Sequence, residues 1–209
     1  MQGDISATPP ANTETIALGG DPTLFYRLEG FPVPPARFFS ETFDSVGAPD
    51  LPEGWTTDAN ESDAGTTVWE LGNTTGGAAN GPATANSPDN CFGTNISSNY
   101  GDGTGIALQT PLINLTDASI ASLGFSFFVD TPEGEESGRV NLKNADGTLI
   151  QEAFGSFFWG QSEGWTQFSM RLPSEALGKE VILEFEFLSG GNADHGAGWY
   201  IDDVVVDES

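Results

Sequence analysis

The chain has 209 residues, with 31 acidic and 6 basic side chains and a formal net charge of −25. This charge makes nucleic acid and anionic lipid poor partners. Apolar residues account for 37 % and aromatic residues for 11 % of the chain, enough to fill the core of one large β domain. The acidity leaves two explanations open: a solvated coat, or a set of divalent-cation sites.

Three absences narrow the class of protein. Cys91 is the single cysteine, so neither an intrachain disulfide nor a cysteine-based zinc site is available, and its apolar strand indicates a packing role. No apolar run is long enough for a membrane-spanning helix, so we expect no membrane insertion. The start of the chain lacks a secretion signal, so we expect that an exported form is a piece without its signal.

Residues 1–36 differ in composition from the rest. They are rich in Pro, Thr and Ala and contain one short apolar piece, TLFYRLEG at 23–30. This pattern predicts a linker-like extension with one short strand. That strand is either the end of an upstream domain in a larger multidomain chain or an extra edge strand of the main domain, which we place at 37–209.

Strand-sized runs bounded by Gly, Asp, Asn and Pro occur from Arg37 onward. In chain order they are 37–44, 66–71, 90–97, 105–110, 122–130, 138–150, 165–172, 180–188 and 197–206. The run 138–150 is typical of a hairpin that turns at Asp146 and Gly147. Only 174–179 is suited to a helical turn.

Alternation within these runs predicts half-buried antiparallel strands. In 122–130 the residues Leu123, Phe125, Phe127 and Val129 share one face, and in 180–188 Glu184 and Glu186 point away from the apolar face. About ten strands without an amphipathic helix predict an all-β fold, an antiparallel two-sheet jelly-roll sandwich.

Five motifs in a fixed order resemble the MAM domains of meprin-type surface proteins and the bacterial choice-of-anchor J domains. They are ETFDS with LPEGW, VWELG, LQTPLINL, GWTQFSMRL and GWYIDDVVV, and together they cover residues 38–207. The resemblance implies a galactose-binding or MAM-like jelly roll, a non-catalytic role in adhesion or ligand binding, and often a bound calcium ion. The paired cysteines of animal MAM domains are missing, so their disulfides do not carry over.

Four carboxylates are candidate metal ligands. Alternation sets Glu41 between inward-facing Phe39 and Phe43, and the doublet Asp202 and Asp203 interrupts an apolar strand. If the first and last strands are neighbours, as the resemblance implies, Glu41, Asp44, Asp202 and Asp203 converge, and oxygen ligands of this kind suit Ca²⁺. Two alternatives stay open: the doublet accepts backbone hydrogen bonds at a bulge, or it pairs with Arg37 or Arg139.

The glycine-rich loops at 100–105 and 189–198 offer further oxygen ligands through Asp102, Asn192 or Asp194, although plain turns are the simpler interpretation. His195 is the single histidine, and one histidine makes neither a zinc pair nor a catalytic pair. No GxSxG, HExxH, phosphate-loop or dinucleotide motif occurs.

Aromatic side chains are the candidate ligand contacts. Phe157, Phe158 and Trp159 are consecutive in a glycine-bounded segment and cannot all face inward, so they form either an exposed platform or a plug over the sheet edge. Tyr100 begins the glycine-rich loop at 100–105. We take Trp159, Phe158 and Tyr100 as the candidate ligand-binding residues.

The sequence therefore predicts a secreted or cell-surface, calcium-stabilised binding or adhesion module, with a carbohydrate or another cell-surface ligand as its partner. The alternatives are a glycoside hydrolase or polysaccharide lyase that uses paired carboxylates, and a structural spacer domain.

Overall fold

The computed structural model describes residues 34–59, 67–74, 77–78, 80–131, 137–191 and 195–208. Within these ranges the chain forms short strands that are separated by clusters of Gly, Asn and Asp. The strands are β1 (Arg37–Glu41), β2 (Thr56–Ala59), β3 (Trp69–Gly72), β4 (Cys91–Thr94), β5 (Gly105–Gln109), β6 (Ile113–Asn114), β7 (Ser122–Thr131), β8 (Ser137–Asn144), β9 (Leu149–Gln151), β10 (Phe157–Phe158), β11 (Gly160–Gln161), β12 (Thr166–Arg171), β13 (Glu180–Leu188) and β14 (Gly198–Asp207). One 3₁₀ turn, η1 (Ser174–Ala176), occupies the segment expected to be helical.

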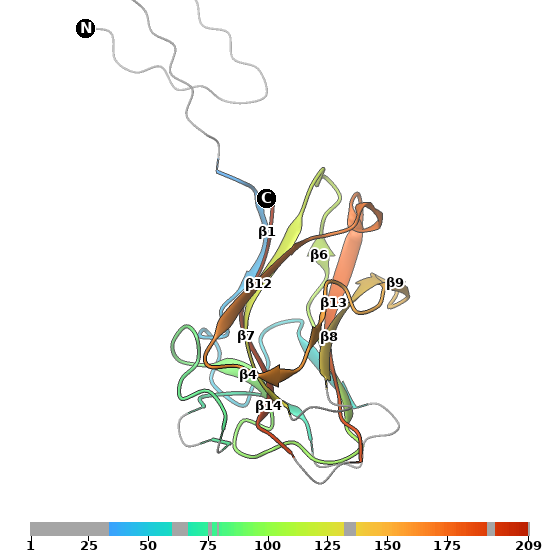
Figure 1. The fold of residues 1–209 in the computed structure, drawn as a ribbon. Helices are drawn as coiled ribbons and strands as arrows, with labels where there is room; N and C mark the ends of the chain where they lie inside the picture. The colour runs from blue at the N-terminus through green and yellow to red at the C-terminus, as the bar shows by residue number, and fades with distance from the viewer. Residues whose placement is uncertain are drawn as a thin grey trace, which may run out of the picture. The chain divides into compact units, whose positions relative to one another are not determined.

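These strands form two antiparallel sheets that face each other (Figure 1). Sheet A has the order β11-β7-β14-β4-β3, with β1 also on β14 and β12 also on β7. Sheet B has the order β10-β8-β13-β5-β2, with β6 on β13 and β9 on β8. The predicted all-β jelly-roll sandwich is confirmed. Residues 35–209 form one compact unit. Residues 1–33, which hold the predicted extension strand, lie outside the described ranges.

Strand β14 organises sheet A. One edge pairs with β7 along its length, while the other edge pairs first with β4, at Tyr200 and Ile201, and then with β1, from Val204 onward. The β14–β7 register shifts between Asp202 and Val205, which marks a bulge. The two aspartates therefore sit where β14 changes from one neighbour to the other.

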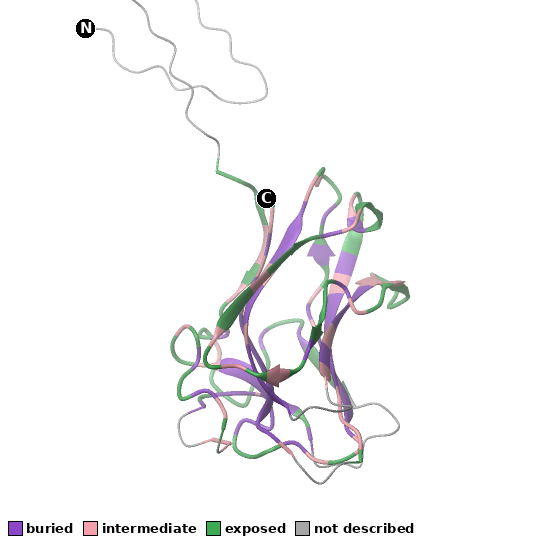
Figure 2. Ribbon diagram, viewed as in Figure 1, coloured by how far each residue is buried: buried purple, intermediate pink, exposed green. Residues whose placement is uncertain are grey.

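The main core fills the space between the sheets. On β13 the predicted inward residues Val181, Leu183, Phe185 and Phe187 are fully buried, and the expected alternation of β7 also holds, with Phe127 only partly buried. Figure 2 shows the same pattern, with buried positions along the central strands and exposed positions along β12. Burial of these side chains supplies the main stabilisation of the fold.

A smaller core lies on the outer face of sheet A, the face turned away from sheet B. Cys91, Phe128 and Tyr200 pack there with residues of the covering loops. The indole Nε1 of Trp165 donates a 2.8 Å hydrogen bond to the Thr84 carbonyl and ties the covering segment 80–90 to the sheet. Burial raises the pKa of the Cys91 thiol, with a smaller contribution from the negative charge of Asp202.

Residues 157–161 join the two sheets, because β10 belongs to sheet B and β11 to sheet A. Phe158 points inward and stacks on Trp199, with ring centroids 5.0 Å apart. Its neighbours point outward: Phe157 is 52 % and Trp159 58 % exposed. The segment is thus a plug and an exposed aromatic pair at once.

We expect Phe158→Ala to lower the free energy of unfolding by about 3–5 kcal/mol, because it removes a buried ring that joins β10 of sheet B to Phe125 and Trp199 of sheet A. Phe157→Ala, one residue away but exposed, should change it by less than about 1 kcal/mol. Urea unfolding of the two variants measures both values. Equal effects would contradict the assignment of Phe158 as the plug.

Cys91 should resist thiol reagents in the folded protein, since the thiolate is the reactive form and burial disfavours it. Labelling with a chromogenic disulfide reagent should be slow in buffer and fast in denaturant. Rapid stoichiometric labelling of the native protein would show that the loop segment 80–90 does not cover this face.

Candidate functional site

Asp202 is fully buried beneath the loop that leads into β4. Its Oδ2 accepts hydrogen bonds from the backbone N–H groups of Asn86 and Ser87 at 2.9 and 3.0 Å, and its Oδ1 accepts one from the N–H of Asp203 at 2.8 Å. Burial raises the pKa of Asp202 to about 7, the nearby Asp203 charge adds to the rise, and these N–H donors oppose it. The carboxylate therefore anchors the loop to the centre of sheet A.

Asp203 is the bulged residue, with a left-handed backbone at φ 51° that is uncommon for a residue with a Cβ. Its carboxylate accepts hydrogen bonds from Asn86 Nδ2 at 2.6 Å and from Ser87 Oγ at 2.9 Å. A regular strand would send the two aspartates to opposite faces, but the bulge inserts Asp203 as an extra residue, and both carboxylates reach the same loop. The alternative in which the doublet accepts backbone hydrogen bonds at a bulge describes Asp202, while Asp203 accepts from the side chains of the same two loop residues.

Asp44 reaches the same loop from the end of β1. Its Oδ1 accepts a 3.2 Å hydrogen bond from the Asn90 N–H, and its Oδ2 lies 3.4 Å from Ser87 Oγ. The Ser87 hydroxyl has one hydrogen, so it donates to either Asp203 or Asp44. The carboxylate oxygen of the other aspartate then faces Ser87 Oγ with no hydrogen between the two oxygens. Three of the four predicted ligands thus meet at Asn86 and Ser87, two residues that sequence reasoning did not identify.

Glu41 is placed differently from the prediction. Strand β1 ends at Glu41, and Phe43 adopts a left-handed backbone at φ 64°, so the alternation stops there. The carboxylate is partly exposed and accepts a 2.9 Å hydrogen bond from the Phe43 N–H. It is therefore not buried between two inward phenylalanines, and β1 still lies beside β14 as expected.

A cation would fit the chemistry of this cluster, which we define as Glu41, Asp44, Asp202 and Asp203. In the described ranges none of these carboxylates pairs with Lys or Arg: Arg139 pairs with Glu152 and Glu186, Lys143 pairs with Glu184, and Arg37 makes no ion pair there. The side-chain donors are all oxygen, as Ca²⁺ prefers. Within the same ranges, no three His, Cys, Asp or Glu side chains are gathered into a ready-made metal-binding group.

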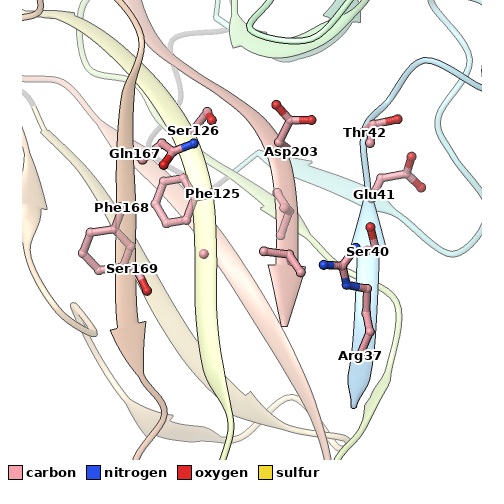
Figure 3. Close-up of a pocket in the computed structure, with 13 residues that line it drawn as sticks. Arg37, Ser40, Glu41, Thr42, Phe125, Ser126, Gln167, Phe168, Ser169 and Asp203 are labelled. Atoms are coloured by element: carbon pink, nitrogen blue, oxygen red, sulfur yellow. The ribbon is translucent and has the colours of Figure 1, made fainter. Parts of the chain in front are cut away.

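A groove of about 450 Å³ runs over the outer face of sheet A beside this cluster (Figure 3). Its walls and floor come from four adjacent strands, β1, β14, β7 and β12. Glu41 and Asp203 line one end, and Arg37 begins the β1 wall. The segment 80–90 covers the other part of this sheet face, so the cluster stands between the covered and the open parts.

The outer face of sheet B carries polar residues that are bonded to one another. Asn141 Nδ2 donates to Glu184 and Glu186 at 3.0 and 2.8 Å, and Gln109 Nε2 donates to Glu184 at 2.6 Å. Lys143 pairs with Glu184 and Arg139 with Glu186. The predicted outward direction of the two glutamates is confirmed, and the network shields both from solvent.

The candidate aromatic ligand contacts separate into two groups. Phe158 and Tyr100 are buried, with Tyr100 packed edge-on against Phe187, so neither ring offers a free face to a ligand. Trp159 remains exposed, and Phe157 joins it. In the loops, His195 Nε2 lies 2.6 Å from Asp102 Oδ1, while Asn192 and Asp194 lie outside the described residues.

No helix in the described residues is long and apolar enough to span a membrane. No family model matches the chain. Among curated proteins it is similar to bacillopeptidase F of Bacillus subtilis, with 26 % identity over 175 residues. That match covers 81 % of this chain but only 12 % of the relative, so the chain spans a small part of the relative's length.

Solved structures share the fold. The K1 cleaved adhesin domain of Lys-gingipain from Porphyromonas gingivalis has a TM-score of 0.51 and 19 % identity, over 82 % of this chain and 98 % of that domain. The CBM22-1 xylan-binding domain of Paenibacillus barcinonensis Xyn10C has a TM-score of 0.47 and 12 % identity, over 83 % and 94 %. The likeness to the adhesin domain shows a shared β-sandwich fold.

Proposed function

We propose that the chain is a non-catalytic, calcium-stabilised binding module of a larger exported protein and that its ligand is a carbohydrate. The observation that carries the proposal is the exposed pair Phe157 and Trp159, held on either side of buried Phe158. Aromatic rings that are rigid and exposed provide flat apolar surfaces, and the C–H face of a sugar ring packs on such a surface. The likeness to the adhesin domain supports the fold on which this rests.

Charge selects among the possible carbohydrates. At a net charge of −25 the module repels acidic polysaccharides as it repels nucleic acid. The two cations described on the outer face of sheet B, Arg139 and Lys143, are already paired with glutamates. A neutral glycan is therefore the ligand class that the surface favours.

Calcium at the carboxylate cluster would stabilise the module. Glu41, Asp44 and Asp203 would hold the ion, and the buried Asp202 would keep the loop in place beneath them. The ion would supply positive charge where two carboxylates share one hydroxyl. Because the site unites β1, β14 and the segment 80–90, bound metal would stabilise the folded state over the unfolded chain.

A hydrolase with paired carboxylates is the rival hypothesis, and one observation favours it: Glu41 and Asp203 both line the groove. A general acid must hold a proton and give it to the glycosidic oxygen. Both oxygens of Asp203 instead accept hydrogen bonds from Asn86 and Ser87, and Glu41 accepts one from the backbone of Phe43. These contacts suit anchoring better than proton transfer.

We expect the thermal midpoint in millimolar calcium to exceed that in excess chelator by about 5 °C, since metal bound only to the native state stabilises it by mass action. The double variant Asp44→Asn, Asp203→Asn should lose this difference. Differential scanning calorimetry measures all four midpoints.

Asp58→Asn is the matched control, because Asp58 is an exposed carboxylate on β2 of the other sheet. It should keep the full calcium response. A wild-type midpoint that does not change with calcium would overturn the calcium proposal.

Affinity electrophoresis against soluble xylan, β-1,4-galactan and glucan, with alginate as an acidic comparison, tests the ligand class. We expect retardation by at least one neutral polysaccharide and none by alginate. Trp159→Ala should weaken that binding about tenfold, the loss of one stacked aromatic contact.

Leu149→Ala is the control, since Leu149 is similarly exposed at 52 % but offers no ring. No retardation by any polysaccharide would overturn the carbohydrate proposal and favour the spacer. Release of reducing ends would instead favour the hydrolase.

A further inference from the structure

The groove on sheet A has a floor of small side chains in cross-strand register. Ser40 pairs with Val205, Val205 with Gly124, and Gly124 with Ser169, so one row crosses β1, β14, β7 and β12. A Cβ on Gly124 would lie 3.1 Å from a Val205 methyl group. The missing side chain therefore keeps the middle of the groove open.

The next row supplies polar groups. Ser126 pairs with Asp202 on one side and Gln167 on the other, and all three lie beside the open part of the sheet. Ser126 is only 2 % exposed and lines the groove, yet its hydroxyl makes no hydrogen bond with any described residue. The oxygen of this hydroxyl is not enclosed in the core but opens onto the groove, so it can donate to or accept from a ligand there.

The other polar, non-acidic side chains of the groove resemble Ser126 in this respect. No side-chain hydrogen bond or ion pair with the described part of the chain is made by Arg37, Ser40, Thr42, Gln167 or Ser169. On the outer face of sheet B, in contrast, polar side chains such as Asn141 and Gln109 are bonded to their neighbours. Among the described residues, the groove on sheet A thus has hydrogen-bond donors and acceptors without a protein partner, whereas polar groups on the outer face of sheet B bond to one another.

The chemistry of the lining limits the occupant. Serine, glutamine and a guanidinium group around a small-residue floor recognise a ligand rich in hydroxyl groups. A protein partner would need large exposed aromatic or aliphatic anchors, whereas the apolar side chains that line the groove are buried, apart from half-buried Phe168 and Val205. Glu41 and Asp203 at one end disfavour an anionic ligand. A volume of about 450 Å³ suits a short stretch of a sugar chain.

We infer that this groove is a second, hydrogen-bonding subsite for a neutral glycan, separate from the aromatic pair Phe157 and Trp159. Ser126 and Gln167 bind ring hydroxyl groups, and Ser169 and Ser40 flank the chain of sugars. The inference rests on the proposed carbohydrate function for its ligand class only.

Affinity electrophoresis of variants, with the neutral polysaccharide that retards the wild-type protein most, tests the groove. Ser169→Phe places a ring over the groove from an exposed position on β12, and it should weaken binding at least tenfold. Gln167→Ala removes one amide and should weaken binding about two- to fivefold. Thermal midpoints close to the wild type would show that both variants fold.

Matched controls lie on sheet B. Thr56→Phe adds a ring to an exposed position of β2, and Gln151→Ala removes an exposed amide from β9, and both should bind like the wild type. If Trp159→Ala is weakened while Ser169→Phe and Gln167→Ala bind within twofold of the wild type, the groove inference is overturned and the proposed function stands. Wild-type protein that binds no polysaccharide overturns both.

Discussion

The site depends on one buried carboxylate. Asp202 lies where β14 exchanges β4 for β1 as its neighbour, and three backbone N–H groups converge on it. A strand that changes partners leaves a gap in its ladder, and backbone groups in such a gap need an acceptor. Asp202 supplies that acceptor, closes the gap with residues 86–87, and so fixes where the covered part of sheet A ends.

This anchor divides the outer face of sheet A into two environments. On one side the segment 80–90 buries Cys91, Phe128 and Tyr200 in a small apolar core. On the other side lies the groove, whose serine, glutamine and arginine side chains have no partner among the described residues. The bulge at Asp203 and the left-handed residue Phe43 flank the boundary, and strained backbone of this kind is often kept where it serves a site.

Most of the fold could be predicted from the sequence, because period-two alternation directly reports the buried face of strands such as β13 and β7. The site was harder. The acids of the cluster could be found because Asp202 and Asp203 interrupt an apolar strand, but Ser87 and Asn86 lie in a loop without periodicity. A bulge shifts the alternation by one residue, and no local pattern signals it. The sequence carries a signal for Ser126 and Gln167, because both alternate with core residues on their strands and therefore point outward. Polar residues at such positions are common on any protein surface, so this signal does not single them out.

Backbone amide NMR during titration with a fragment of the bound neutral glycan tests most directly whether the open part of sheet A is a binding surface. We expect the shifts to concentrate at 124–126 of β7, 167–169 of β12 and the aromatic pair Phe157 and Trp159, with little change on β13 and β5. Shifts confined to the outer face of sheet B, around Asn141, Glu184 and Gln109, would contradict the assignment of the binding surface to sheet A.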